Sequence, residues 1–326
     1  MPAKVLVTGG AGFIGSHAVK LLLDDGADVT TLDNLSSGHR AAVLGGRFIE
    51  GDLEDRPLLA ALFAEHRFDA VMHFASSIQV GESVTAPAKY YANNLRTTIN
   101  LLEAMVGVGT NRLVFSSSAA IFGEPSYLPI DESHQKNAIN PYGFSKWVVE
   151  RILADYDRAY GLRSVSLRYF NAAGADPDGL VGERHEPETH LVPLILRVAA
   201  GKAPHIKVFG ADYPTPDGTC IRDYVHVTDL CQAHVLALKW LEREQRSTAF
   251  NLGNGNGFSV REVIAAVERV TGRPIGVQQV SRRAGDPAVL VADSIAARRD
   301  LGWIPRYDSL DVIIQHAWNW ERKQNA

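Results

Sequence analysis

The sequence predicts an α/β fold: a doubly wound parallel sheet followed by a smaller, loop-rich α/β lobe. Through the first half of the chain, short apolar runs alternate with longer helical patterns, which is typical of βαβ units. Each run ends in a polar or glycine-rich turn, so the runs indicate strands buried on both faces. The predicted strands are 4–8, 28–32, 47–51, 70–74, 112–116 and 164–169. Right-handed crossovers bring their carboxyl ends to one edge of the sheet, where ligands of such folds bind.

The pattern changes after Asn171, where proline and glycine become frequent. We therefore expect a first domain over residues 1–172 and a second lobe over 173–326, with a helix at about 226–242 packing back on the first domain. In the second lobe, Ser259-x-x-Glu262 is a capping box that predicts the start of a helix ending near Gly272.

Composition excludes several classes of protein. With 326 residues, 46% of them hydrophobic and 21% charged, the chain has ordinary globular composition. The net charge of -4 and the absence of a basic block give no reason to expect nucleic acid or a membrane surface as a partner. Two cysteines, Cys220 and Cys231, are too few for a disulfide framework. Without a signal peptide or a long apolar run, we expect a cytoplasmic protein.

A glycine-rich loop directly follows the first predicted strand. It contains Gly9, Gly12 and Gly15 and opens a helix. Glycine spacing alone is weak, since about 0.2 such patterns arise by chance in a chain of this composition. Its position carries the prediction, because bare backbone N–H groups and the helix dipole favour a pyrophosphate there. The loop therefore predicts a Rossmann-like dinucleotide site.

Acidic residues end the next two strands. Asp33 follows Gly15 by eighteen residues, where a carboxylate accepts hydrogen bonds from an adenosine ribose and repels a 2′-phosphate. This position favours NAD over NADP. Asp52, at the end of the third strand, is either an adenine contact or a turn aspartate.

Three side chains form a candidate proton-transfer unit. Tyr142 and Lys146 follow Pro141 and lie four residues apart, on one face of a predicted helix. We expect the ammonium to lower the pKa of the phenol. Ser116, Ser117 and Ser118 end the fifth strand, on the same sheet edge as the glycine loop. Beside a dinucleotide, such a unit oxidises an alcohol: the tyrosinate removes the proton while hydride leaves.

One apparent metal motif is rejected. His185 to His190 resembles HExxH but has one residue too many, and Pro187 lies where a helix would have to continue. We do not expect these two histidines to face one zinc ion, and we predict no metal.

With these motifs, the chain resembles the nucleotide-sugar epimerases of the extended short-chain dehydrogenase/reductase family from end to end. The matching stretches are 7–17, 32–35, 73–75, 80–83, 90–94, 115–118, 141–146, 167–171, 217–224, 251–253 and 282–286. The resemblance implies reversible 4-epimerisation of UDP-glucose and UDP-galactose, through a 4-keto intermediate and with bound NAD, in galactose metabolism. It also implies a homodimer, although the apolar residues of helices 95–106 and 148–153 could equally face the sheet.

The resemblance also implies residue roles. The catalytic group is Ser118, Tyr142 and Lys146. The NAD contacts are Gly9, Gly12, Phe13, Ile14, Gly15, Asp33, Asn34, Ser37, Asp52, Leu53, Phe74, Ala75, Asn94, Ser116, Tyr142, Lys146 and Phe170. The contacts with the UDP-sugar are Ser118, Tyr142, Asn171, His190, Leu191, Val208, Phe209, Arg222, Tyr224, Arg283, Asp286 and Leu290.

Three positions depart from patterns seen in relatives: Ile78 replaces a lysine, His190 an asparagine, and Leu290 is a gatekeeper of intermediate bulk. Acceptance of N-acetylated sugars stays open for this reason. Two other functions also stay open: 4-epimerisation of a UDP-pentose, and NAD binding without catalysis. Dehydration is disfavoured, because Ala119-Ala120 follows Ser118 where a dehydratase carries an acidic pair.

Overall fold

A seven-stranded parallel sheet forms the larger lobe of the computed structural model, which describes residues 3–283 and 286–324. Its order is β11-β6-β5-β4-β1-β2-β3, and every neighbouring pair is parallel. The strands are β1 (Lys4–Thr8), β2 (Asp28–Asp33), β3 (Arg47–Glu50), β4 (Ala70–His73), β5 (Arg112–Ser116), β6 (Arg163–Tyr169) and β11 (Thr248–Leu252). The strand order reverses beside β1, so the predicted doubly wound sheet is confirmed.

The six strands predicted from apolar runs are all present, with bounds that differ by one residue at most. The seventh, β11, was not predicted. It follows a long helix in the loop-rich half of the chain, and its five residues include Thr248 and Asn251. Its pairing with β6 extends the large sheet beyond residue 172, and the division of the chain at that residue stays a prediction.

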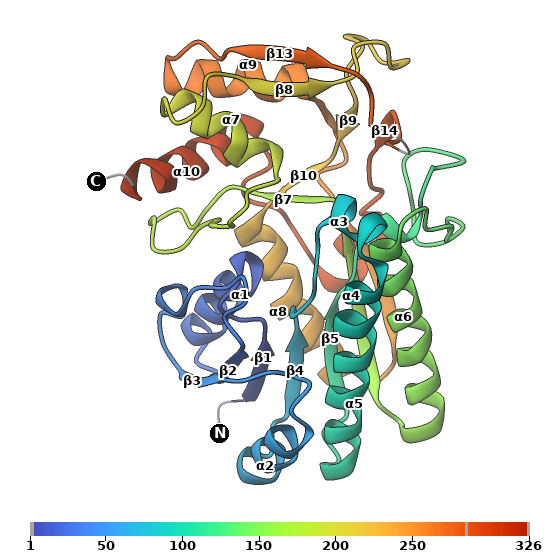
Figure 1. The fold of residues 1–326 in the computed structure, drawn as a ribbon. Helices are drawn as coiled ribbons and strands as arrows, with labels where there is room; N and C mark the ends of the chain where they lie inside the picture. The colour runs from blue at the N-terminus through green and yellow to red at the C-terminus, as the bar shows by residue number, and fades with distance from the viewer. Residues whose placement is uncertain (1–2, 284–285, 325–326) are drawn as a thin grey trace.

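Two layers of helices cover the sheet (Figure 1). α1 (Phe13–Asp24) and α8 (Val227–Glu244) pack together on one face, over Val5, Val7 and Val114. α2 (Arg56–His66), α5 (Thr97–Val108) and α6 (Pro141–Tyr160) cover the other face, over Leu6, Leu113 and other strand residues. The hydrophobic core therefore forms two layers of side chains, one on each face of the sheet, because successive residues of a strand point to opposite faces.

A helical segment before α5 is irregular. α3 (Val80–Thr85) and α4 (Pro87–Tyr91) lead into a π-helical turn, η2 (Ala92–Arg96), which continues directly into α5. Short 3₁₀ turns follow β2 and β5, namely η1 (Arg40–Ala42) and η3 (Ala119–Ile121). π-Turns inside helices are frequent at functional sites, and this one carries Asn94.

The smaller lobe is drawn above the sheet edge in Figure 1. Its strands are β7 (Asn171–Ala173), β8 (Ile206–Phe209), β9 (Ile221–Arg222), β10 (Tyr224–His226), β12 (Phe258–Ser259), β13 (Val277–Val280) and β14 (Val289–Leu290). Its helices are α7 (Leu191–Ala199), α9 (Val260–Thr271) and α10 (Leu310–Lys323). The π-turn η4 (Ala297–Leu301) packs instead against α8 and β11 of the larger lobe. The capping box at Ser259 and the end of α9 at Gly272 are confirmed. No helix within the described ranges is long and apolar enough to cross a membrane.

Candidate functional site

The glycine loop between β1 and α1 is shaped by close backbone contacts. A Cβ on Gly15 would lie 2.1 Å from the carbonyl oxygen of Gly9, and one on Gly9 would lie 2.5 Å from the amide nitrogen of Ala75. Gly9 also has a φ of 75°, which favours glycine. Any larger side chain at either position would push the loop apart.

The N-terminus of α1 is open to an anion. Gly12 is its N-cap and supplies no side-chain hydrogen bond, and the first turn carries no acidic residue. The first backbone N–H groups of a helix lack partners within the helix, and the helix dipole favours negative charge there. The loop therefore fits the pyrophosphate of a dinucleotide.

Asp33 links the second strand to this loop. One of its carboxylate oxygens accepts a hydrogen bond from the backbone of Ala11 at 2.9 Å, and the other accepts from the backbone of Leu35 at 2.8 Å. Each oxygen keeps a lone pair for a ribose hydroxyl. Beside it, the Asn34 amide donates to Asp52 at 2.7 Å, which ties together the ends of β2 and β3.

The structure brings together Ser118, Tyr142 and Lys146. Ser118 follows β5 and caps η3, whereas Tyr142 and Lys146 lie in the first turns of α6. All three are buried. The Ser118 hydroxyl lies close enough to the Tyr142 phenol to lower its pKa, and the Lys146 Nζ lies 5.9 Å from the centre of the phenol ring. The arrangement suits passage of a proton between a hydroxyl and the phenol oxygen.

Burial dominates the titration of this group. It raises the pKa of Tyr142, against the opposing effect of the nearby Ser118 hydroxyl. Burial also lowers the pKa of Lys146 to about 7. The expectation that Lys146 lowers the pKa of Tyr142 is therefore wrong for this structure. The reason is that burial of the phenol outweighs the nearby ammonium, which gives its hydrogen bond to the carbonyl oxygen of Ser116, at 2.9 Å.

The other predicted cofactor contacts lie in several parts of the larger lobe. Phe13, Ile14, Phe74 and Ala75 surround the glycine loop: Ala75 bonds the backbone of Thr8, and Phe74 packs on His234 with ring centres 4.8 Å apart. Ser37 is exposed in the loop after β2, and Phe170 directly follows β6 and packs beside η3. Leu53 is different, because its side chain is buried in the sheet core.

Asn94 is held firmly by its neighbours. Its side-chain oxygen accepts from the backbone of Ser77 at 2.8 Å, and its amide donates to Ser145 at 3.0 Å and to the Ser77 carbonyl at 3.1 Å. These bonds join the π-turn to α6 and to the loop after β4. Asn94 thus orders the wall of the site next to Tyr142's helix.

Sequence reasoning missed several polar residues of the site. His73 ends β4, is buried between the hydroxyls of Thr8 and Thr98, at 2.7 and 2.9 Å, and has its pKa lowered to about 3 by burial. Tyr169 hydrogen-bonds Ser116. Tyr169 and His73 are both polar residues at the end of a buried strand, on the sheet edge where ligands bind. This position is the sequence signal that could have identified them.

The second lobe contributes most of the predicted substrate contacts. Arg222 on β9 pairs with Asp286 and lies opposite Leu290 in the β9–β14 register. The Arg283 guanidinium lies 3.9 Å from the centre of the Phe209 ring. Both arginines therefore lie in one lobe, next to carboxylate or aromatic partners. Gly285 of the same motif is outside the described residues.

The remaining predicted substrate contacts differ in exposure. Asn171 donates from its amide to the Asp223 carbonyl at 3.0 Å. Val208 and Tyr224 are buried in the hydrophobic core of the second lobe, and Leu191 packs against this core. The side chains of Val208 and Tyr224 therefore pack mainly against protein.

The loop before α7 brings His185 and His190 closer together than the helix spacing rule suggested, and the prediction of no metal stays a prediction. His185 and His190 were not expected to face one metal ion, but with Glu183 and Glu188 they offer ligand atoms that all lie within 4.8 Å of one another. The expectation assumed that a helix was needed to align the histidines. Residues 183–190 form no helix, and the loop folds both imidazoles toward the same carboxylates.

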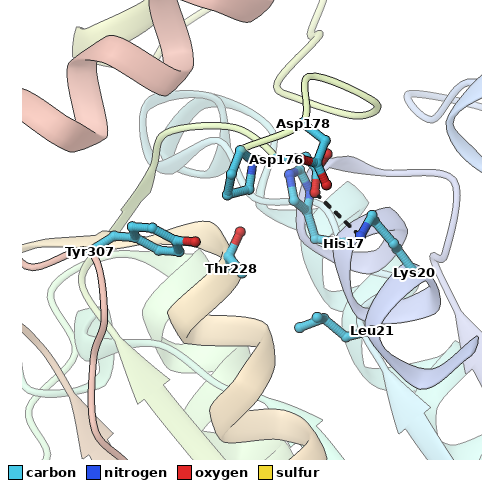
Figure 2. Close-up of a pocket in the computed structure, with 8 residues that line it drawn as sticks. His17, Lys20, Leu21, Asp176, Asp178, Thr228 and Tyr307 are labelled. Atoms are coloured by element: carbon cyan, nitrogen blue, oxygen red, sulfur yellow. Dashed lines mark ion pairs between the residues drawn. The ribbon is translucent and has the colours of Figure 1, made fainter. Parts of the chain in front are cut away.

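A separate cavity of about 210 Å³ lies between α1, the start of α8 and the 176–178 loop. Figure 2 shows Lys20 of α1 and Asp176 facing one another across it, with an ion-pair distance of 3.6 Å, and Thr228 and Tyr307 nearby. None of Ser118, Tyr142 and Lys146 lines this cavity. It is therefore distinct from the proton-transfer group.

A doubly wound sheet with this glycine loop and this serine, tyrosine and lysine group defines a Rossmann-like protein of the short-chain dehydrogenase/reductase type. Residues 5–253 match the NAD dependent epimerase/dehydratase family, and the chain belongs to that family.

Relatives resemble the chain over nearly its full length. It is 52% identical over 317 residues to the UDP-glucose 4-epimerase of Lacticaseibacillus casei, which covers 97% of this chain and 96% of the relative. The solved UDP-glucose 4-epimerase of Brucella ovis in complex with NAD is 52% identical, with a TM-score of 0.95 over 97% of this chain and 98% of the other. That of Bifidobacterium longum, in complex with NAD⁺ and UDP, is 40% identical, with a TM-score of 0.95 over 99% of both.

These similarities confirm the predicted family, the predicted fold and an NAD-dependent epimerase activity. They also confirm NAD as the cofactor.

Proposed function

We propose that the protein catalyses the reversible 4-epimerisation of UDP-glucose and UDP-galactose. The observation that carries this proposal is the grouping of Ser118, Tyr142 and Lys146 at the carboxyl edge of the sheet, next to the glycine loop. A protein that only binds NAD has no use for such a group. The near full-length similarity to UDP-glucose 4-epimerases supports the choice of sugar.

In this mechanism Tyr142 takes the proton from the 4-hydroxyl of the sugar and later returns it. The chemistry that bound NAD supplies is reversible hydride transfer with carbon 4. Because burial raises the pKa of Tyr142, the phenol is protonated at neutral pH. The reactive form is the phenolate: as it takes a proton from the Ser118 hydroxyl, that hydroxyl takes the proton of the sugar 4-hydroxyl, and the return step reverses both transfers.

The glycine loop and Asp33 hold the cofactor in this proposal. The open N-terminus of α1 receives the pyrophosphate, and the free lone pairs of Asp33 bind the adenosine ribose. The other predicted NAD contacts keep the roles that the resemblance implies.

The second lobe would hold UDP. Arg222 and Arg283 neutralise the diphosphate through forked hydrogen bonds, which requires Arg222 to share its guanidinium between phosphate and Asp286. Leu290 faces the sugar beside Arg222. Tight binding of UDP with a loosely held sugar lets the 4-keto sugar turn and accept hydride on its other face.

Product analysis tests this function. Purified protein is incubated with UDP-galactose without added reductant, and the nucleotide sugars are separated chromatographically. We expect UDP-glucose to appear. Turnover of UDP-pentoses alone would indicate the pentose alternative, and retained NAD without turnover of any UDP-sugar would indicate a binding protein.

We also propose that the enzyme is a cytoplasmic homodimer. The apolar residues Leu101, Leu102 and Met105 of α5 face the sheet, so they are not available for a partner. Tyr91 of α4 and Phe144 of α6 are instead exposed on one side of the molecule, and their rings pack edge to face with centres 6.3 Å apart. A dimer through this side predicts twice the chain mass by light scattering, and Phe144→Glu reduces it to the monomer mass.

A further inference from the structure

We propose that Glu183, His185, Glu188 and His190 form a binding site for one divalent transition-metal ion, with zinc as the best fit. The four residues lie in the loop that precedes α7, and their ligand atoms lie within 4.8 Å of one another. The site contains none of Ser118, Tyr142 and Lys146 but includes His190, which was predicted as a UDP-sugar contact, and it goes beyond the proposed epimerisation.

The two carboxylates of this cluster are buried without a permanent cation. The side chains of Glu183 and Glu188 are 6% and 2% exposed. Across the described part of the chain, their ion-pair partners are the two histidines alone, with no lysine or arginine within 4.0 Å. Two buried negative charges require compensation. A divalent ion with two neutral imidazoles brings the net charge of the site to zero.

Two of the donor atoms lack a hydrogen bond. The Nδ1 of His185 and the Oε1 of Glu183 are buried and have no hydrogen-bond partner among the described residues, although they lie 3.3 Å apart. The two atoms are close enough for a hydrogen bond, but they are not aligned as donor and acceptor. The Oε1 of Glu183 also lies 2.6 Å from the Nδ1 of His190 without an aligned hydrogen bond, so these three atoms converge on one point where a cation would fit between them.

The distances fit the size of a zinc site. Zinc binds imidazole nitrogen and carboxylate oxygen at about 2.0–2.2 Å, which places tetrahedral ligands about 3.3 Å apart. The Nδ1 atoms of His185 and His190 lie 3.3 and 2.6 Å from Glu183, and 3.9 and 3.1 Å from Glu188. These four separations already lie near that value, whereas the widest pair in the cluster, up to 4.8 Å apart, must close as the ion binds.

The type of donor selects among metals. Imidazole nitrogens suit zinc and other first-row transition metals, whereas magnesium and calcium prefer oxygen ligands only. Two imidazoles and two carboxylates therefore favour zinc over the hard cations that are abundant in cells.

The bound ion would fasten the loop at both ends. The His185 ring packs edge to face near Phe13 at the glycine loop, with centres 6.5 Å apart, and His190 is the N-cap of α7. A metal that joins His185 to His190 thus links the dinucleotide loop to the first helix of the second lobe. We expect the ion to act on stability more than on the chemical step.

Direct titration tests the site. Tag-free protein is treated with a chelator, desalted and titrated with Zn²⁺ by calorimetry, and with Co²⁺ by visible absorption. We expect one ion per chain with submicromolar affinity and a tetrahedral Co²⁺ spectrum. His185→Ala and Glu183→Gln each weaken Zn²⁺ binding by about 100-fold. The control His205→Ala, at an exposed position outside the cluster, leaves binding unchanged.

A second control guards against binding at the other close pair of histidines, His226 and His316, whose ring nitrogens lie 3.0 Å apart. Loss of Zn²⁺ binding in His316→Ala would place the ion there and overturn the proposal. So would wild-type protein that takes up no Zn²⁺ at micromolar concentrations, since the cluster would then be a buried ion pair of His190 with Glu183. The wild-type titration decides this even if a variant fails to fold.

Discussion

Lys146 donates a hydrogen bond from its Nζ to the carbonyl oxygen of Ser116 at 2.9 Å. This bond fixes the ammonium between the carboxyl end of β5 and the ring of Tyr142, 5.9 Å from the ring centre. The end of β5, which leads directly to the relay hydroxyl of Ser118, therefore also orients the electrostatic partner of Tyr142.

Replacement of Lys146 by methionine keeps the apolar stem and removes the charge. We expect kcat to fall by about 10²–10³-fold, because the phenolate loses its nearby positive charge. Retained NAD, read from the absorbance of the purified protein, should fall as well. Lys239→Met, an exposed lysine on α8, is the matched control and should keep wild-type turnover. Equal activity in the two variants would contradict this role for Lys146.

The same lysine makes stability depend on pH. Its folded-state pKa of about 7 lies below the value of 10.5 in an unfolded chain, so between these values the unfolded chain binds one more proton. The contribution of Lys146 to the free energy of unfolding is therefore least favourable below pH 7. It becomes more favourable as the pH rises above 7. The free energy of unfolding of the wild type, minus that of Lys146→Met, should grow by about 1.4 kcal/mol per pH unit from pH 7 to 9.5. Urea unfolding at several pH values measures it, and a constant difference would refute the buried lysine.

Gly15→Ala tests the geometry of the dinucleotide loop. The new Cβ would lie 2.1 Å from the Gly9 carbonyl oxygen, so the loop must open and lose its cofactor. We expect loss of retained NAD and a destabilisation of about 1–3 kcal/mol. Gly107→Ala on α5 meets no atom within 4 Å and should instead stabilise by about 0.5–1 kcal/mol. Thermal unfolding and NAD content separate the two, and full NAD content in Gly15→Ala would show that the loop is not the cofactor site.

Asp33→Asn tests the choice of cofactor. The amide keeps one acceptor for a backbone bond but removes the negative charge that repels a 2′-phosphate. We expect the affinity for NAD to fall by about 10-fold, which corresponds to about 1.4 kcal/mol of binding free energy. The preference for NAD over NADP should shrink as well. Calorimetric titration with both cofactors measures the ratio. An unchanged ratio would remove Asp33 from cofactor selection.

Particular features decided what the sequence could predict. Each of the six predicted strands is a short apolar run between turns, and the glycine loop and Ser118 follow such runs directly, so their place at the sheet edge followed from topology. Tyr142 and Lys146 were predictable because a four-residue spacing on a helix fixes a shared face.

Other features depend on contacts distant in sequence. β11 forms a strand because it pairs with β6. In this pairing Thr248 lies beside Val165, which is 83 residues earlier in the sequence. The π-turn that carries Asn94 needs an inserted residue in a helix, which leaves no mark in composition. The histidines at 185 and 190 meet through an irregular loop, where the spacing rules for helices do not apply.

The epimerisation rate of Tyr142→Phe is the most direct test of the central claim. The variant removes one oxygen from a buried ring and should keep bound NAD. We expect the conversion of UDP-galactose to UDP-glucose to fall by about 10³-fold or more, whereas Tyr160→Phe, exposed at the end of the same helix, keeps the wild-type rate. Conversion by Tyr142→Phe at the wild-type rate would contradict the assignment of Tyr142 as the proton-transfer group.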